Sequence, residues 1–203
     1  DYIEAVEWTG DDVWHAHCAQ LTAEEIRLFA RTGTGVAHCP CSNMRLASGV
    51  APVRAMLDAG MKVGLGVDGS ASSDSGHMLN EARQTMLLQR VNQGGNAMSA
   101  REALATATRG GASVLGRDDI GMLAPGMAAD IACFDRRSVD FAGSDWDMLA
   151  SLLFCGPVKA SHTIINGRIV VAEGQLASMD MDRLLSNHRR MAHDLMVKAG
   201  HAS

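Results

Sequence analysis

The chain has 203 residues, of which 47% are hydrophobic and 20% charged. This composition is typical of a folded globular protein and excludes a disordered or fibrous one. The formal net charge is −5 at pH 7 and no long basic run occurs, so nucleic acid and anionic membrane surfaces are excluded as partners. No apolar stretch approaches the roughly 18 residues of a membrane span and no signal peptide is recognisable, so we expect a cytoplasmic protein.

The cysteine pattern favours reduced thiols. Five cysteines are present, and an odd number in a chain of this length does not indicate a disulfide framework. Cys39 and Cys41 are separated by one residue, whereas structural zinc sites use pairs separated by two to four. We therefore predict free, buried cysteines and no zinc site made of cysteines.

The first 115 or so residues alternate short apolar segments with helical patterns. The predicted strands are residues 13–18, 36–39 and 61–67. The predicted helices begin at a capping box at Thr22, at Pro52, near His77 and at a second capping box at Ser99, and they extend to about residues 30, 59, 93 and 108. Strands that alternate with helices in this way predict a parallel sheet or barrel.

The pattern changes after Gly116. Residues 130–135 read as a short strand, and residues 162–165 and 168–171 flank an Asn-Gly pair, which is the strongest two-residue hairpin signal. A helical pattern returns from about residue 181 to 198. The sequence therefore predicts an α/β body, a small β module and a terminal helix.

Polar residues follow the three predicted parallel strands. His17, His38 and Asp68 lie at or near the carboxyl ends of successive strands, where reactive groups converge in parallel α/β folds. His15 shares a strand face with His17 and could chelate a metal with it, but we expect only His17 to act. Residues 64–69 match G-x-G-x-x-G, yet the first glycines lie inside the strand, which argues against a dinucleotide site.

Several segments resemble the amidohydrolase superfamily, and within it the deaminases. They are a Trp-containing strand that ends at His17, AHCPCSNMRLASG at residues 37–49 and GLGVDGSAS at residues 64–72. GMLAPGMAAD at residues 121–130 and NGRIVV at residues 166–171 are similar to the composite β-sandwich of that superfamily. The resemblance covers nearly the whole chain and is greatest to deaminases of oxidised purines.

The resemblance implies an α/β fold made of the C-terminal part of a (β/α)8 TIM-type barrel and part of a small composite β-sandwich domain. Residues 1–118 would form strands six to eight of the barrel with their helices. Residues 119–178 would form a β-sandwich segment with a connecting helix, and residues 179–203 a C-terminal helix. Because three strands cannot close a barrel that needs about 250 residues, we expect the front half to precede this chain.

The resemblance also implies one zinc ion per subunit, or iron in its place, at the mouth of the barrel. Asp68 would be a metal ligand and the base that moves the proton, and His17 would orient the attacking hydroxide. The remaining metal ligands of the family have no counterpart here, so we expect them upstream. His38, Arg45 and Ser70 are candidates for contact with the substrate.

The implied activity is hydrolytic deamination of a small purine, in which 8-oxoguanine and water give urate and ammonia. Isoxanthopterin, guanine or a related purine or pterin ring is the alternative substrate for the same chemistry. Two other classes stay open: a non-catalytic scaffold with the amidohydrolase fold, and a free-standing domain that binds a small molecule. The charged terminal helix predicts a solvated face or a subunit contact, and we expect a homo-oligomer.

Overall fold

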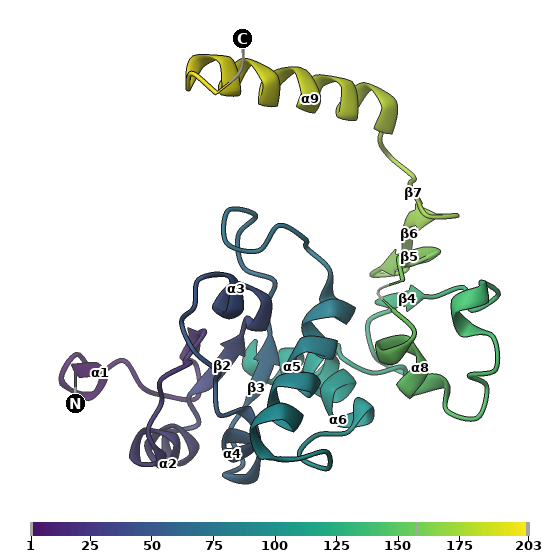
Figure 1. Cartoon of the computed structure of the whole chain (residues 1–203). Helices are drawn as coiled ribbons and strands as arrows, with labels where there is room; N and C mark the ends of the chain where they lie inside the picture. Colours follow the sequence, from purple (N-terminus) through teal and green to yellow (C-terminus); the bar gives the residue numbers. More distant parts are fainter. Residues whose placement is uncertain (1, 157, 202–203) are drawn as a thin grey trace. The chain divides into compact units, whose positions relative to one another are not determined.

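The computed structural model describes residues 2–156 and 158–201 (Figure 1). The chain forms two compact units. The first comprises Asp1–Met127 and Arg136–Val158, and the second comprises Ala128–Asp135 and Lys159–Ser203.

The first unit is built on a parallel sheet of three strands. They are β1 (Trp14–Ala16), β2 (Gly35–His38) and β3 (Val63–Leu65), in the order β1-β2-β3. His15 is in register with Val36, and Ala37 with Gly64. The predicted parallel arrangement is confirmed, but the first and third strands are shorter than the sequence pattern indicated. At the end of β1 the backbone leaves the extended region, because His17 has a φ of 65°.

The other elements of the first unit are helices and turns (Figure 1). They are α1 (Tyr2–Ala5), α2 (Ala23–Thr32), α3 (Pro40–Arg45), α4 (Val53–Asp58), α5 (Met78–Gln93), α6 (Ala100–Ala105), α7 (Gly111–Val114) and α8 (Met148–Phe154), with a 3-10 turn η2 (Val139–Phe141). Both predicted capping boxes are confirmed, since the hydroxyls of Thr22 and Ser99 accept hydrogen bonds from the amides of Glu25 and Glu102 and the two carboxylates bond back.

Two parts of the first unit differ from the sequence prediction. The short helix α3 was not among the predicted helices; Pro40 occupies its first turn, where its missing N–H has no cost. The predicted helix over residues 99–108 is interrupted, because α6 passes into a π-helical turn η1 (Thr106–Gly110) before α7. At this turn Gly110 approaches the carbonyl oxygen of Val63 so closely that a Cβ atom would lie 2.2 Å from it.

The core of the first unit lies between the sheet and the helices. Its fully buried members include Phe29, Val36, Met56, Met86 and Leu153. Leu153 belongs to α8, which was expected to accompany the β module. Instead α8 packs on α5 and α6 within the first unit, and Arg83 of α5 donates hydrogen bonds to the carbonyl oxygens of Leu153 and Phe154 at 2.6 and 2.9 Å.

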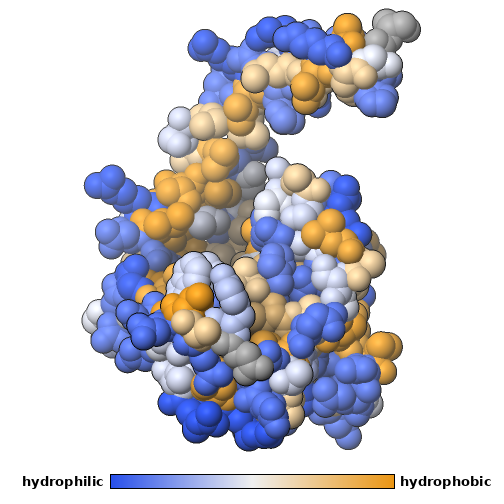
Figure 2. All heavy atoms as spheres, turned by 90° about the vertical axis from the view of Figure 1, so that its left-hand side faces the viewer, coloured by the Kyte–Doolittle hydropathy of each residue, from blue (hydrophilic) through white to orange (hydrophobic). Residues whose placement is uncertain are grey.

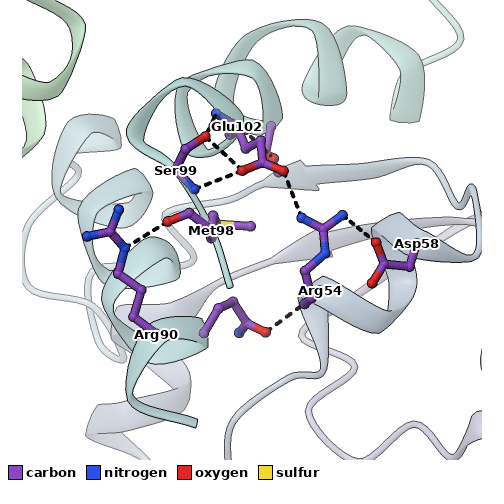
Figure 3. Close-up of polar contacts among 8 residues, drawn as sticks. Arg54, Asp58, Arg90, Met98, Ser99 and Glu102 are labelled. Atoms are coloured by element: carbon purple, nitrogen blue, oxygen red, sulfur yellow. Dashed lines mark hydrogen bonds and ion pairs between the residues drawn. The ribbon is translucent and has the colours of Figure 1, made fainter. Parts of the chain in front are cut away.

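A polar network ties α4, α5 and α6 together (Figure 3). The guanidinium of Arg54 lies 2.7 Å from Asp58 Oδ1 and donates a hydrogen bond to Glu102 Oε1 at 2.8 Å. The backbone amide of Arg54 donates to the side chain of Gln89 on α5. Since α4 and α5 both contact β3, this network fixes two of the helices that support the strand leading to Asp68.

The second unit contains an antiparallel sheet and the terminal helix. The strands are β4 (Ile131–Cys133), β5 (His162–Ile165), β6 (Arg168–Ala172) and β7 (Gln175–Leu176), in the order β4-β5-β6-β7. The predicted hairpin is confirmed, and Asn166 and Gly167 have the positive φ values of 46° and 77° that its turn requires. The predicted helix is confirmed as α9 (Met181–Lys198).

Exposed apolar side chains are frequent in the second unit. They include Ile165, Ile169, Leu184, Leu185, Met191 and Leu195, and Figure 2 shows apolar groups interspersed with hydrophilic ones on one face of the molecule. None of the helices in the described ranges is both long and apolar enough to cross a membrane. The five cysteines are free, as predicted, but only Cys39 is buried and Cys133 is exposed on β4, where the expectation of buried thiols was wrong.

Candidate active site

The carboxyl edge of the parallel sheet brings two of the predicted site residues together. His17 directly follows β1, and Asp68 follows β3 by three residues. Nε2 of His17 lies 3.7 Å from Oδ2 of Asp68. This separation exceeds a hydrogen bond, and it allows one small polar molecule to contact both atoms.

Both residues have an unusual backbone conformation. The φ values of His17 and Asp68 are 65° and 60°, and that of Cys18 is 49°. The left-handed region costs a residue with a Cβ atom about 1–2 kcal/mol, so such residues persist only where their surroundings hold them. The amide of His17 is held by a hydrogen bond of 2.9 Å to the carbonyl oxygen of Ala37 in β2. Conformations of this kind concentrate at functional sites.

Three donors surround the carboxylate of Asp68. Oδ2 accepts hydrogen bonds from the hydroxyls of Ser42 at 2.5 Å and Ser72 at 2.7 Å, and Oδ1 accepts one from the amide of Gly69 at 2.7 Å. The Ser42 hydroxyl is the largest influence, followed by Ser72, Gly69 and the nearby His17, and together they lower the pKa of Asp68 to about 2. The carboxylate is therefore ionised at neutral pH, and it stays accessible because 28% of the side chain is exposed.

The imidazole of His17 is held by an amide. Nδ1 of His17 donates a hydrogen bond to Oδ1 of Asn43 at 2.9 Å, because an amide oxygen only accepts. In the neutral ring Nε2 is then the unprotonated nitrogen, and it is the one that faces Asp68. An imidazole with this tautomer can accept a hydrogen bond from a polar molecule placed between itself and the carboxylate.

His38 lies in the interior behind this pair. It ends β2, and none of its surface is exposed. Burial, with a smaller contribution from the neighbouring His17, lowers the pKa of His38 to about 4, so the ring is neutral at physiological pH. His15 is directed elsewhere: its ring stacks on Phe29 with the centroids 5.3 Å apart, and its Nε2 lies 3.2 Å from the carbonyl oxygen of Trp8.

Arg45 and Ser70 occupy the rim of the site. Arg45 is the last residue of α3, and its guanidinium forms an ion pair with Asp74. Both side chains of this pair are more than half exposed, at 51% and 69%. Ser70 is exposed in the loop that follows Asp68. Neither residue is bonded to His17 or Asp68 in the described structure.

A pocket opens beside His17. Its volume is about 520 Å³, and its lining includes His17, Gln20, Leu21, Glu25 and Leu46. This volume is in the range of small-molecule sites, and the lining combines apolar side chains with a few polar groups, as such sites usually do. The pocket borders the His17 imidazole, and Asp68 is not part of its lining.

The metal-binding capacity of this chain is limited. No group of three or more His, Cys, Asp and Glu side chains that could hold a metal ion occurs among residues 2–156 and 158–201. Asp68 nevertheless fits a zinc ligand, because its carboxylate is ionised and partly exposed. The residues present fit one protein ligand of a zinc site.

Two residues of the site, Ser42 and Asn43, were not recognised from the sequence. Both are buried, with 0% and 1% exposed surface, and both lie on α3. Their sequence signal is Pro40, which indicates the first turn of a helix directly after the strand that ends at His38. A helix that begins there places residues 42 and 43 on its first turns, next to the strand ends.

Comparison with known proteins adds independent information. The profile of the amidohydrolase family matches residues 1–170. The chain is 45% identical to 8-oxoguanine deaminase of Pseudomonas aeruginosa, over 97% of this chain and 44% of the relative. It is 37% identical to isoxanthopterin deaminase from an unknown prokaryotic organism, over 94% and 42%. The chain thus spans less than half the length of these relatives.

Solved structures show the same fold. Atrazine chlorohydrolase from Arthrobacter aurescens TC1, crystallised with zinc, matches with a TM-score of 0.85 and 38% identity over 92% of this chain and 42% of that protein. An adenosine deaminase from Xanthomonas campestris with bound zinc matches with a TM-score of 0.89 and 31% identity, over 97% and 45%.

Proposed function

Because this chain belongs to the amidohydrolase family, we propose that it supplies the C-terminal part of a zinc-dependent aminohydrolase that deaminates a purine ring. The first candidate substrate is 8-oxoguanine, which would react with water to give urate and ammonia. The 45% identity to 8-oxoguanine deaminase supports this choice. Isoxanthopterin is the second candidate, supported by the relative at 37% identity, and guanine is a third ring of the same chemistry.

We further propose that β1, β2 and β3 are strands six, seven and eight of a (β/α)8 barrel. The sheet is parallel, and its order follows the chain, as in a barrel. The structural matches support this assignment, since they cover 92–97% of this chain but only 42–45% of the larger proteins. The ligands that complete the zinc site would then come from strands upstream of this chain.

Zinc held in part by Asp68, or iron in its place, would supply a positive charge that lowers the pKa of water towards about 7. The ionised carboxylate of Asp68 takes a proton from the attacking water and passes it to the departing amine. The water oxygen forms a new bond to the ring carbon that carries the amine. The carbon–nitrogen bond then breaks, and the protonated amine leaves as ammonia. The low pKa of Asp68 keeps the carboxylate free to accept that proton at the start of each cycle.

His17 acts as the second polar group in this proposal. Its unprotonated Nε2 accepts a hydrogen bond from the attacking water and so fixes the direction of attack. The substrate ring would occupy the pocket beside His17, with the polar side chains of Gln20 and Glu25 in its wall. Arg45 and Ser70 are proposed contacts for ring oxygens at the rim, and the buried His38 supports the site from behind.

The single observation that carries the proposal is the pairing of His17 and Asp68. Two strand ends place an imidazole nitrogen 3.7 Å from an ionised carboxylate, and each group is held by a separate buried partner on α3. A scaffold that had lost its activity would not need this arrangement.

The experiment is ammonia release by the zinc-loaded protein that carries this chain, with 8-oxoguanine, guanine and isoxanthopterin in parallel. Asp68→Ala and His17→Ala should each lower kcat by about 100-fold or more. Asp12→Ala, at an exposed position outside the site, is the matched control and should leave kcat unchanged. Preference for another ring would change the substrate, whereas no turnover and no bound metal would favour the scaffold.

We also propose that the protein assembles as a homo-oligomer. The exposed apolar side chains of α9, such as Leu184, Leu185 and Met191, are candidates for the subunit contact. Light scattering coupled to gel filtration measures the mass directly. A monomer mass at micromolar concentration would contradict this proposal and leave the proposed reaction untouched.

A further inference from the structure

Three consecutive residues of α3 bond to three different elements. The amide of Cys41 donates to Oε2 of Glu81 on α5 at 3.1 Å. The hydroxyl of Ser42 donates to Asp68, after β3, at 2.5 Å. The amide oxygen of Asn43 accepts from His17, after β1, at 2.9 Å. One turn of α3 therefore bonds both members of the proposed catalytic pair, His17 and Asp68, and is itself bonded by Glu81 of α5.

The anchor on α5 is buried. Glu81 has no exposed surface, and its carboxyl group accepts a hydrogen bond from the amide of Cys41 in the first turn of α3. At its last turn, the amides of Leu46 and Ser48 donate to the carbonyl oxygens of Ser42 and Asn43 at 2.9 Å each. The helix also packs on α5, so Glu81 and this packing hold α3 through contacts that do not involve His17 or Asp68.

The contact with Asn43 selects one tautomer of His17. The hydrogen bond from Nδ1 to Asn43 turns Nε2 towards Asp68, so in the neutral ring the lone pair of Nε2 faces Asp68 and the space where the reacting water would lie. Without an acceptor at Nδ1, the imidazole is free to carry its proton on Nε2, which could then only donate. The orientation of the ring and its role as an acceptor both depend on this one amide oxygen.

The contact with Ser42 fixes the Asp68 carboxylate. Ser42 bonds Oδ2, the oxygen that faces His17, and Ser42 is fully buried. Ser72 also bonds Oδ2, but it lies on the exposed loop that carries Asp68 itself. Ser42 is therefore the donor that links the carboxylate to the rigid part of the first unit.

We propose that Ser42 and Asn43 are positioning residues for the proposed deamination, in which α3, anchored by Glu81, holds the Asp68 carboxylate and the Nδ1–H tautomer of His17 in reacting geometry. This inference rests on the proposed function for its kinetic part. Its structural part concerns only residues of this chain. Loss of partners that orient groups at a metal site commonly lowers activity by 10–100-fold.

The test compares Asn43→Ala, Asn43→Asp and Ser42→Ala in the full-length protein. The matched controls are Asn92→Ala and Ser113→Ala, at exposed helical positions away from the site. The first readout is the nitrogen NMR spectrum of the His17 ring in the metal-free protein, which shows which nitrogen carries the proton. The second readout is kcat and KM of the zinc-loaded protein.

We expect Asn43→Ala to lose the Nδ1–H tautomer and Asn43→Asp to retain it, because a carboxylate oxygen still accepts from Nδ1. Asn43→Ala and Ser42→Ala should each lower kcat by about 10- to 100-fold with a small change in KM, and the controls should match the wild type. If Asn43→Ala does not fold, an Nε2–H tautomer in Asn43→Asp overturns the inference.

The two proposals fail in different ways. An unchanged His17 tautomer in folded Asn43→Ala would overturn the positioning role even if the wild-type protein deaminates 8-oxoguanine. Absence of turnover by the wild type would overturn the proposed function, while the NMR comparison would still decide the role of Asn43. Unchanged kcat in Ser42→Ala, with an active wild type, would overturn the role of Ser42.

Discussion

The contact between η1 and β3 leads to a prediction with a built-in control. Gly110 and Gly111 are adjacent, and both have ordinary helical backbone angles, with φ values near −60° and −59°. A Cβ atom on Gly110 would lie 2.2 Å from the carbonyl oxygen of Val63, whereas one on Gly111 would meet nothing within 4 Å. Alanine therefore clashes with backbone at one position and enters open space at the next.

The expected magnitudes follow from this difference. In a helix, alanine is more favourable than glycine by about 1 kcal/mol, and this gain applies to both positions. Overpacking at a tight contact costs about 1–3 kcal/mol. At Gly110 the cost should lie at the upper end, because a carbonyl group of a strand cannot move aside as a side chain can. Gly111→Ala should therefore exceed Gly110→Ala in free energy of unfolding by about 2–3 kcal/mol.

Urea denaturation of the two variants and the wild type, followed by circular dichroism, measures these differences. Gly111→Ala should be the most stable of the three proteins, the wild type intermediate and Gly110→Ala the least stable. The ammonia assay adds a second observation: because β3 leads to Asp68, displacement of the strand should lower kcat in Gly110→Ala only. Equal urea midpoints of unfolding for the two alanine variants would refute the steric argument, because they would show that a Cβ atom at residue 110 does not clash with β3.

Three further predictions concern groups that are fully or partly buried. The folded pKa of His38, about 4, lies below its unfolded value of 6.5. The free energy of unfolding should therefore fall by up to about 3 kcal/mol as the pH drops from about 6.5 to 4. Urea titrations at several pH values measure this decrease, and it should be smaller in His38→Leu. The pKa of Cys18, raised mainly by burial to about 11 from 9.0, predicts alkylation by iodoacetamide at pH 8 about 100-fold slower than for a free thiol, measurable by mass spectrometry. Leu153→Ala should lower the free energy of unfolding by about 2–5 kcal/mol, because α8 belongs to the core of the first unit. A loss below 1 kcal/mol would contradict that assignment.

The elements that could be predicted from the sequence are those with a local cause. The capping boxes at Thr22 and Ser99 satisfy helix termini with residues only three positions apart. The hairpin turn at Asn166 and Gly167 needs positive φ angles that these two residue types tolerate. Such signals act within one turn, so no knowledge of the tertiary structure is required to read them.

The elements that were missed depend on distant parts of the chain. The π-helical turn η1 exists where the backbone must fit against β3, 40 or more residues earlier in the sequence. The assignment of α8 to the first unit depends on Leu153 and on the hydrogen bonds from Arg83, 70 residues away. The local sequence of residues 99–108 does not indicate the contact with β3, and that of residues 148–154 does not indicate the contact with Arg83.

The candidate site divides in the same way. His17 and Asp68 could be found because parallel strands bring their carboxyl ends to one edge, so position in the pattern was sufficient. Ser42 and Asn43 could not, because their importance arises from contacts with residues 26 positions away in each case. A helix predicted at Pro40 would have placed them near the strand ends without revealing which residue each one bonds.

The backbone at the strand ends adds a last argument for a chemical role. Elsewhere in the chain glycine occupies many of the left-handed positions, such as Gly33 after α2 and Gly60 after α4, although Glu7, Ala47 and Glu173 adopt this conformation too. At His17 and Asp68 the same conformation is kept with side chains for which it is unfavourable. Glycine at those two positions would remove the backbone cost but also the imidazole and the carboxylate. The hydrogen bonds from α3 offset the cost in part, which is the arrangement expected where a sequence retains side chains for what they do rather than for stability.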